Sequence, residues 1–192
     1  IEWLQAIPLE PRLTNHTIRL LQSGCFYLHG RDKWYRPCFV MDGRIMADLA
    51  KREPEVITEQ VFNDMFVFLF RYLKHVLLVP GHIEQWVSIC DLNNMSMTSL
   101  PRKQILAFGN LCQSNLMYFL FRSFYTHVGW GQRLFYKGVQ MFIDNETKAK
   151  IVLAEGGAPE GLVSMFHPDQ LERRFGGNRP TPTNFWPPYM GQ

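Results

Sequence analysis

The sequence predicts an α/β domain with a mostly parallel, four- to five-stranded sheet flanked by helices. Short apolar and β-branched runs alternate along the chain with longer segments of helical spacing, which is the pattern of successive strand–helix–strand units. The 192 residues are close to the size of one domain and contain no internal repeat. Right-handed crossovers between parallel strands would place helices on both faces of the sheet.

Three elements are predicted before Pro80. Residues 9–21 carry leucines on one side of a helix, and the apolar run at residues 38–41 is a strand that ends in an Asp42-Gly43 turn signal. Residues 58–78 place apolar side chains at helical spacing and stop before Pro80-Gly81, so they form a second helix.

The alternation continues after Pro80. Residues 85–92 are a buried strand ending in a polar turn, and Pro101 lies in the first turn of a helix that runs to about residue 121. The run at residues 123–128 is a strand, and residues 130–143 form an apolar helix that contains two glycines. The remaining predicted elements are helical turns at residues 145–150, a strand at residues 151–154, and short helical pieces at residues 159–166 and 169–175.

Composition indicates a protein that holds something apolar. Apolar residues make up 46% of the chain and charged residues 19%, which excludes a disordered, collagen-like or coiled-coil chain. Fifteen Phe and nine Met are more than a core of this size needs. The net charge of +3 is too small for nucleic-acid binding, but it is compatible with transient contact with an anionic membrane surface. The uncharged window at residues 104–121 contains too many polar residues to span a bilayer.

Enzyme chemistry is not visible. The sequence lacks the nucleophile-elbow, P-loop and dinucleotide-binding motifs and has no short metal-ligand spacing, so we expect no enzyme, metal or cofactor. Asp91 ends a predicted strand, where α/β enzymes often keep a carboxylate, but capping of the Asn93-Asn94 turn also explains it. No two of the four cysteines form a CxxC pair, and their apolar surroundings favour free thiols in a reducing compartment.

Four segments, in order, resemble motifs of the CRAL-TRIO lipid-binding domain family, which includes the phosphatidylinositol/phosphatidylcholine transfer proteins. The segments are GRDKWYRPCFVMD (residues 30–42), WVSICDLNNMS (residues 86–96), the strand, helix and T-x-x-K run at residues 123–151, and LERRFGG (residues 171–177). The sequence departs from the family pattern at three turns. Tyr35 and Asn94 stand where the family usually has Gly, and His127-Val128-Gly129 replaces its N-A-P.

The resemblance implies an apolar pocket closed by a gating helix at residues 130–143. Because releasing a long acyl chain from a bilayer forfeits about 0.8 kcal/mol per CH₂, a carrier needs an enclosed apolar cavity. An ordinary aromatic-rich core, with the glycines allowing close helix packing, is the alternative. The expected pocket and gate residues are Phe108, Cys112, Phe121, Tyr125, His127, Trp130, Leu134, Phe135, Val139 and Phe142.

The headgroup site is also implied by the resemblance. In the phosphatidylinositol-transfer branch, the Thr and Lys of T-x-x-K hold the inositol phosphate, and they correspond to Thr147 and Lys150 here. Tyr118 occupies the position of that branch's inositol-contacting Glu. A solvated turn with a Glu146–Lys150 ion pair is the alternative.

We therefore expect a non-catalytic, monomeric domain at residues 1–177 that binds, and transfers between membranes, a lipid. Phosphatidylinositol or another phospholipid is favoured over retinoid or tocopherol because of Thr147 and Lys150. Residues 1–29 would be part of an N-terminal helical segment, and residues 178–192 a Pro-rich extension lying on the body. The expected location is cytoplasmic and peripheral to membranes, with no nucleic-acid partner. The alternatives are a protein-interaction module on the same fold, for example one that binds a small GTPase, and a hydrolase with an unfamiliar motif.

Overall fold

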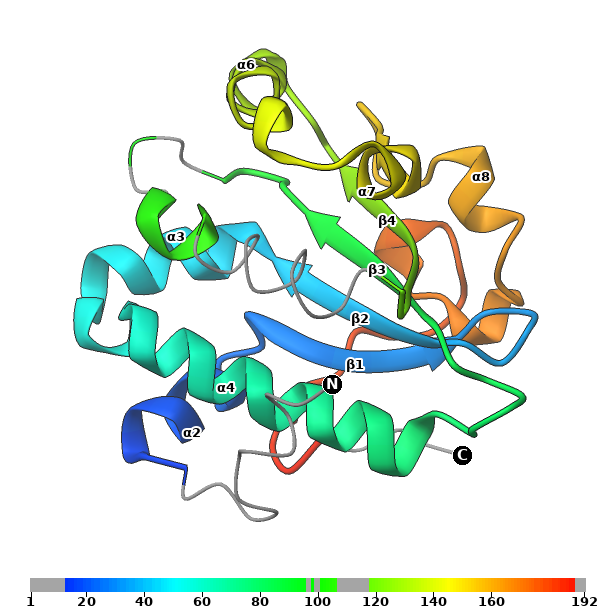
Figure 1. Ribbon diagram of the computed structural model, residues 1–192, viewed down its shortest axis with the longest axis horizontal. Coiled ribbons are helices and arrows are strands. Elements are labelled where there is room, and N and C mark those ends of the chain that lie inside the picture. The colour runs from blue at the N-terminus through cyan, green and yellow to red at the C-terminus, as the bar shows by residue number, and fades with distance from the viewer. Residues whose placement is uncertain (1–12, 96–97, 99–100, 107–117, 189–192) are drawn as a thin grey trace.

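A single five-stranded sheet, in the order β1-β2-β3-β4-β5, organises the chain. The computed structural model describes residues 13–95, 98, 101–106 and 118–188 (Figure 1). Strand β1 is antiparallel to β2, and the other neighbours are parallel. The strands are β1 (Phe26–Arg31), β2 (Pro37–Asp42), β3 (Trp86–Asp91), β4 (Leu120–Thr126) and β5 (Ile151–Leu153). The predicted mostly parallel α/β fold is confirmed.

Helices cover both faces of this sheet. The α-helices are α2 (Asn15–Gln22), α3 (Gly43–Arg52), α4 (Glu59–Tyr72), α6 (Trp130–Val139), α7 (Asn145–Lys150) and α8 (Glu160–Val163). Short 3₁₀ or π turns are η1 (Pro54–Ile57), η2 (Leu73–Leu77), η3 (Gln140–Phe142), η4 (Pro168–Gln170) and η5 (Arg173–Phe175). Residues 102–106 are also helical, and most of the helix predicted to follow Pro101 lies outside the described residues.

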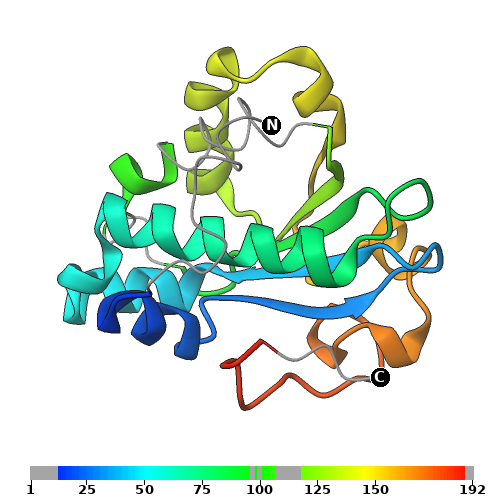
Figure 2. The same ribbon diagram turned by 60° about the horizontal axis from the view of Figure 1, so that its bottom comes forward.

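Strand alternation divides the sheet into two faces that we name by what they contact. The outer face packs against α8 and the C-terminal segments (Figure 2). Its side chains are Cys38, Val40, Val87, Ile89, Phe124 and Val152. The inner face points the other way, and its first two strands lie near α3 and α4. Its side chains are Phe39, Met41, Ser88, Cys90, Ser123, Tyr125, Ile151 and Leu153.

Three predictions about the elements were wrong. Residues 26–29, assigned to an N-terminal helical segment, belong to β1, whose edge position is buried by the later chain. The Asp42-Gly43 pair starts α3 instead of a turn, because the Asp42 carboxylate accepts the Ile45 N–H at 3.0 Å and caps the helix. The helix predicted to reach about residue 121 stops earlier, since β4 begins at Leu120 and pairs with Trp86.

An ion-pair network joins the carboxyl ends of β2 and β3 to the C-terminal segments. Arg174 Nη1 donates to Asp42 Oδ2 at 2.9 Å and to Asp91 Oδ2 at 3.0 Å. Its Nε donates to Glu172 Oε2 at 2.9 Å, and its Nη2 donates to the Tyr27 hydroxyl. The surrounding carboxylates keep the pKa of Arg174 above its usual range, although burial alone would lower it. The positive charge of Arg174 is therefore compensated within the network by the carboxylates of Asp42, Asp91 and Glu172.

The chain after Gly177 lies along β1 and the first helices. Thr181 Oγ1 donates to Glu172 Oε2 at 2.8 Å. The Phe185 ring lies 4.9 Å from that of Tyr27, and the Trp186 ring lies 5.2 Å from that of Phe68. The final segment thus contacts both layers, as its aromatic residues predict.

The three departures from the family motifs share one backbone conformation. Tyr35 has a φ of 63°, Asn94 of 53° and His127 of 55°, which are the positive values among non-glycine residues in the described part of the chain. This left-handed region suits glycine and, less well, asparagine, whereas a tyrosine there is strained. The three positions therefore adopt a conformation that glycine or asparagine takes with less strain than tyrosine.

We predict that Tyr35→Gly leaves the free energy of unfolding unchanged or raises it, by up to about 1 kcal/mol, because glycine adopts this φ without strain. Tyr35→Val should lower it by a similar amount, since a β-branched residue fits the left-handed region poorly. Chemical denaturation of the two variants beside wild type measures both changes. A destabilised Tyr35→Gly protein would contradict the assigned turn.

We also predict that acid weakens the fold through Glu172. Burial alone raises its pKa, but hydrogen bonds from His29, Thr181 and Tyr27 and the charge of Arg174 lower it below 4.5. The unfolded chain therefore takes up this proton at a higher pH than the folded chain, and stability is lost as the pH falls below about 4.5. Thermal melting across this range should show a shallower pH dependence for Glu172→Gln. An unchanged slope in the variant would exclude Glu172 as the source.

Candidate functional site

The outer and inner faces differ in how completely they are covered. Val40, Ile89 and Phe124 on the outer face are each 1% exposed. On the inner face, the β4 and β5 side chains Tyr125, Ile151 and Leu153 are only half-buried, as are Phe39 and Met41 of β2. Val152, at the β5 edge of the outer face, is half-buried as well. An apolar sheet face is normally covered by a helix, because burial removes its apolar area from water. The β4–β5 half of the inner face is therefore the candidate site.

The centre of the inner face contains small polar groups. Ser88 Oγ and Ser123 Oγ hydrogen-bond to each other across β3 and β4 at 2.7 Å. Cys90 is buried beside them, and burial raises its pKa to about 12. The thiol is thus neutral at physiological pH and unsuited to nucleophilic chemistry. The two hydroxyls satisfy each other by this hydrogen bond, and the thiol is uncharged. This part of the inner face is therefore compatible with an apolar guest.

Helix α6 follows β4 directly and lies on the inner-face side of it. Figures 1 and 2 both place α6 and α8 on opposite sides of β4. No described side chain of α6 is buried, and a Cβ added at Gly138 would meet nothing within 4 Å. The alternative of a buried core helix with glycines for close packing is therefore wrong.

The two sides of α6 differ in exposure. Phe135, Tyr136 and Val139 are half-buried, and partial burial raises the pKa of Tyr136. Trp130 and Leu134 are exposed, with Trp130 at 80%. Of the expected gate residues, Phe135 and Val139 thus lie on the half-buried side, and Trp130 and Leu134 on the outside. The side chain of Phe142 is not described.

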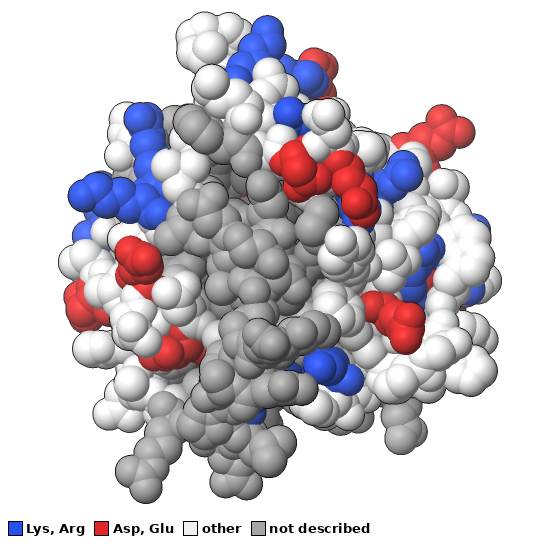
Figure 3. Space-filling view, in the orientation of Figure 1, with Lys and Arg blue, Asp and Glu red and all other residues white. Residues whose placement is uncertain are grey.

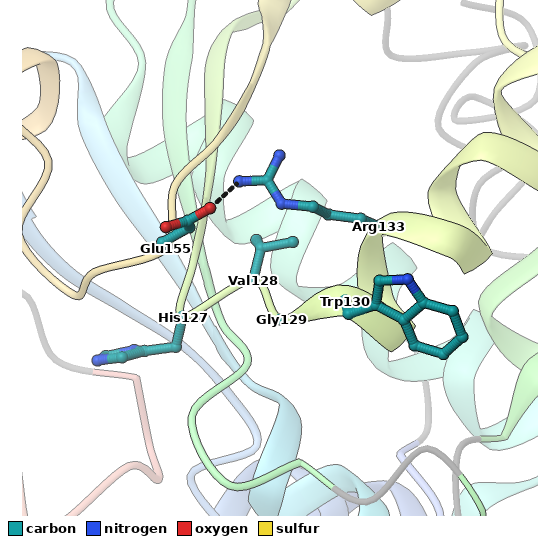
Figure 4. A pocket seen from close by; sticks show the side chains of 6 residues that line it. All are labelled: His127, Val128, Gly129, Trp130, Arg133 and Glu155. Carbon is teal, nitrogen blue, oxygen red and sulfur yellow. Dashed lines mark hydrogen bonds and ion pairs between the residues drawn. The ribbon is translucent and has the colours of Figure 1, made fainter.

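An open pocket of about 470 Å³ lies at the start of α6 (Figure 4). Its lining comprises His127, Val128, Gly129, Trp130, Arg133 and Glu155. Arg133 Nη2 donates to Glu155 Oε1 at 3.1 Å and so joins α6 to the chain after β5, while the Trp130 indole points away from this pair. With an ion pair and a histidine in its wall, this pocket differs from the apolar acyl-chain cavity expected from the sequence.

Two expected pocket residues lie elsewhere. Phe121 packs with the outer-face cluster because a bulge at this point of β4 sets Leu120 and Arg122 opposite the consecutive residues Trp86 and Val87. The Arg36 guanidinium lies 3.3 Å from the centre of the Phe121 ring.

His127 belongs to the hydrogen-bond network at the carboxyl end of β3. Its Nδ1 bonds to Asp91 Oδ1 at 2.9 Å, and its ring lies so close to Gly157 that a Cβ there would be 2.6 Å from His127 Cε1. The Asn93 N–H also donates to Asp91 Oδ1, at 3.0 Å, as the capping alternative predicts. Both Asp91 oxygens thus have structural partners.

The expected headgroup residues come together only in part. Asp144 caps α7 by accepting the Thr147 N–H at 2.8 Å, which directs Thr147 and Lys150 onto one side of the helix. Thr147 Oγ1 is buried beside the Asp144 carboxylate, and the Thr147 side chain and N–H lower the pKa of Asp144. Lys150 Nζ donates to Glu146 Oε1 at 2.9 Å, yet its side chain is only 17% exposed, so the turn is not simply solvated. Tyr118 is exposed at the start of β4.

Several expected features fall outside what can be described. Phe108 and Cys112, expected in the pocket wall, lie in the segment 107–117, which is outside the described residues. Among the described residues, no helix is long and apolar enough to cross a bilayer. Lys and Arg are dispersed over the visible face and form no continuous basic stripe (Figure 3).

Comparisons with known proteins agree with this architecture. The chain is 27% identical to Patellin-6 of Arabidopsis thaliana over 98% of its own length and 47% of that protein. It is 24% identical to Patellin-5 of the same plant, over 79% of this chain and 24% of that one. It therefore spans about half or less of these relatives. The crystal structure of Sfh5 superposes with a TM-score of 0.68 at 14% identity, over 97% of this chain and 64% of that one.

The family model of the CRAL/TRIO domain matches residues 21–177, which include the whole sheet, α6 and the Arg174 network. Because this match covers most of its length, the chain belongs to the CRAL/TRIO family, whose members are known for lipid binding and transfer.

Proposed function

We propose that this chain binds a phospholipid on the inner face and transfers it between membranes without covalent chemistry. The observation that carries the proposal is the half-burial of Tyr125, Ile151 and Leu153 on the inner face, whereas the central outer-face side chains Val40, Ile89 and Phe124 are almost fully buried. Acyl chains laid against these side chains would complete the burial that the protein itself leaves unfinished. Each buried CH₂ contributes about 0.8 kcal/mol, so a long chain supplies a substantial binding free energy.

Helix α6 is the proposed gate. It contributes no buried side chain, lacks a side-chain N-cap and contains Gly131 and Gly138, so little packing opposes its movement. The Arg133–Glu155 pair is exposed on both sides and adds at most about 1 kcal/mol to the closed position. The half-buried residues Phe135 and Val139 would cover the lipid when α6 is closed.

Thr147 and Lys150 are the proposed contacts for the lipid phosphate. The buried Thr147 hydroxyl lies beside the Asp144 carboxylate, and it would donate to a phosphate oxygen of a bound lipid. Lys150 would supply the charge, shared with Glu146 when the site is empty. Tyr118 is exposed at the position of the family's inositol-contacting Glu, so the support extends to an anionic phosphate and not specifically to inositol.

Extraction and native mass spectrometry of the purified protein test the proposed function directly. We expect a co-purified phospholipid in one-to-one ratio, since the inner face needs a single guest to cover it. A protein that carries no lipid and takes none up from vesicles would contradict the proposal and favour a protein-interaction role.

The gate is tested by a matched pair of substitutions on α6. Val139→Asp places a charge on the half-buried side and should reduce lipid retention and vesicle-to-vesicle transfer at least about tenfold, because a carboxylate is costly beside acyl chains. Leu134→Asp places the same charge on the exposed side and should retain the bound lipid. Both variants should melt like wild type, and equal retention by both would contradict an inward-facing gate surface.

The phosphate contact is tested by Lys150→Ala. Removing the ammonium should lower affinity for an anionic phospholipid about tenfold, the scale of one charge-assisted hydrogen bond, and affect a neutral apolar ligand much less. Competition binding with fluorescent lipids of the two kinds measures the ratio. An equal loss for both ligands would indicate general damage and contradict a headgroup role.

A further inference from the structure

A second set of exposed apolar side chains lies at the end of the sheet where the parallel strands begin. It comes from the β1–β2 turn, the segment between α4 and β3, and the residue two places before β4. We name it the strand-entry patch, and its members are Trp34, Tyr35, Val76, Val79 and Tyr118. Since α6 starts where β4 ends, the patch and α6 belong to opposite ends of the sheet, and Figure 1 shows the β1–β2 turn far from α6.

Hydrogen bonds join the three segments of the patch into one surface. Arg31 Nη1 donates to the Tyr35 carbonyl at 2.7 Å and to the Leu77 carbonyl at 3.2 Å, which links the turn to the segment after α4. Gln85 Nε2 donates to the Tyr118 carbonyl at 3.2 Å and links that segment to the start of β4. These bonds hold the three segments of the patch next to one another.

The turn holds its two aromatic residues outward. Asp32 Oδ1 accepts the N–H groups of Trp34 and Arg36, each at 2.9 Å, and Asp32 Oδ2 accepts Arg36 Nε at 2.6 Å. The Arg36 guanidinium also lies 5.0 Å from the Trp34 ring centre. Trp34 is nevertheless 59% exposed and Tyr35 69%. Their exposure thus comes from a rigid turn.

Tyr35 gives an independent reason to expect a partner. Its φ of 63° is strained for a tyrosine, and its largely exposed ring recovers little packing within the protein. Strain of this kind points to a contact made outside the folded chain. Trp and Tyr are the residues that favour the boundary between water and lipid, because their rings are apolar and carry one polar group.

The charge of the surrounding segments identifies the partner. Residues 31–36, 73–85 and 118–122 contain five Lys or Arg against two Asp or Glu, and one of the two, Asp32, is buried in its pair with Arg36. Their excess equals the +3 of the whole chain, so the remaining residues are together neutral. Positive charge beside Trp and Tyr complements an anionic lipid surface.

We propose that the strand-entry patch docks the protein on anionic bilayers, separately from α6. The inference rests on the proposed function, because a lipid carrier has to reach a membrane.

The test is sedimentation with vesicles of phosphatidylcholine alone and of phosphatidylcholine mixed with phosphatidylserine. Wild type should bind the mixed vesicles more strongly, and added salt should weaken that binding. The double variant Trp34→Ala/Tyr35→Gly should lose at least about tenfold in partition coefficient, as expected for removing two large rings from the interface. Its thermal stability should not fall, since glycine suits the turn.

Trp130→Ala is the matched control, because it removes a strongly exposed Trp from α6 instead of from the patch. We expect it to bind mixed vesicles like wild type. Wild-type binding by the double variant, or loss confined to Trp130→Ala, would overturn the proposal and leave the patch to a protein partner. Lipid content, measured separately by mass spectrometry, distinguishes the two proposals: patch-dependent docking by a protein that carries no lipid supports docking and contradicts lipid transfer.

Discussion

The unequal coverage of the two faces of one sheet underlies every functional feature of this protein. On the outer face, Val40, Ile89 and Phe124 pack against the C-terminal segments and are almost inaccessible to water. On the inner face, the β4–β5 side chains are half-covered. Apolar area in contact with water is unfavourable, so a guest that covers it gains binding free energy in proportion to the area removed. The same sheet thus provides a rigid support on one side and a binding surface on the other.

The Arg174 network supplies the rigidity. Arg174 connects Asp42, Asp91 and Glu172, and therefore links β2, β3 and the C-terminal segments. Because Asp91 also accepts from His127 just before α6, the same network fixes the point from which α6 leaves the sheet. In the proposed gating, α6 would move after Gly129 without disturbing the strands.

The sequence predicted the parallel strands and the long helices because their patterns are local. Residues 38–41, 58–78 and 130–143 show apolar spacing that needs no distant information. Strand β1 was missed because its burial depends on Phe185, which lies far along the chain. Helix α3 was missed because an Asp-Gly pair signals both a turn and a helix start.

The site was less predictable than the fold for similar reasons. The position of Phe121 depends on a bulge in the pairing of β4 with β3, which no local pattern reveals. The sequence analysis named Tyr125, Phe135 and Val139 as candidate site residues, but it did not name Ile151 and Leu153. These two residues lie in a short strand next to a polar helix, and such a pattern gives no sign of which sheet face stays uncovered. The strand-entry patch could not be predicted because its residues come from three separate segments.

The most direct test of a guest on the inner face is methyl NMR with a phospholipid that carries a spin label on its acyl chain. Ile151 and Leu153 point to the inner face, and Val152 between them points to the outer face. We predict that the spin label strongly broadens the methyl signals of Ile151 and Leu153, while the signals of Val152 and Ile89 are retained. Equal broadening on both faces, or none on the inner face, would contradict it.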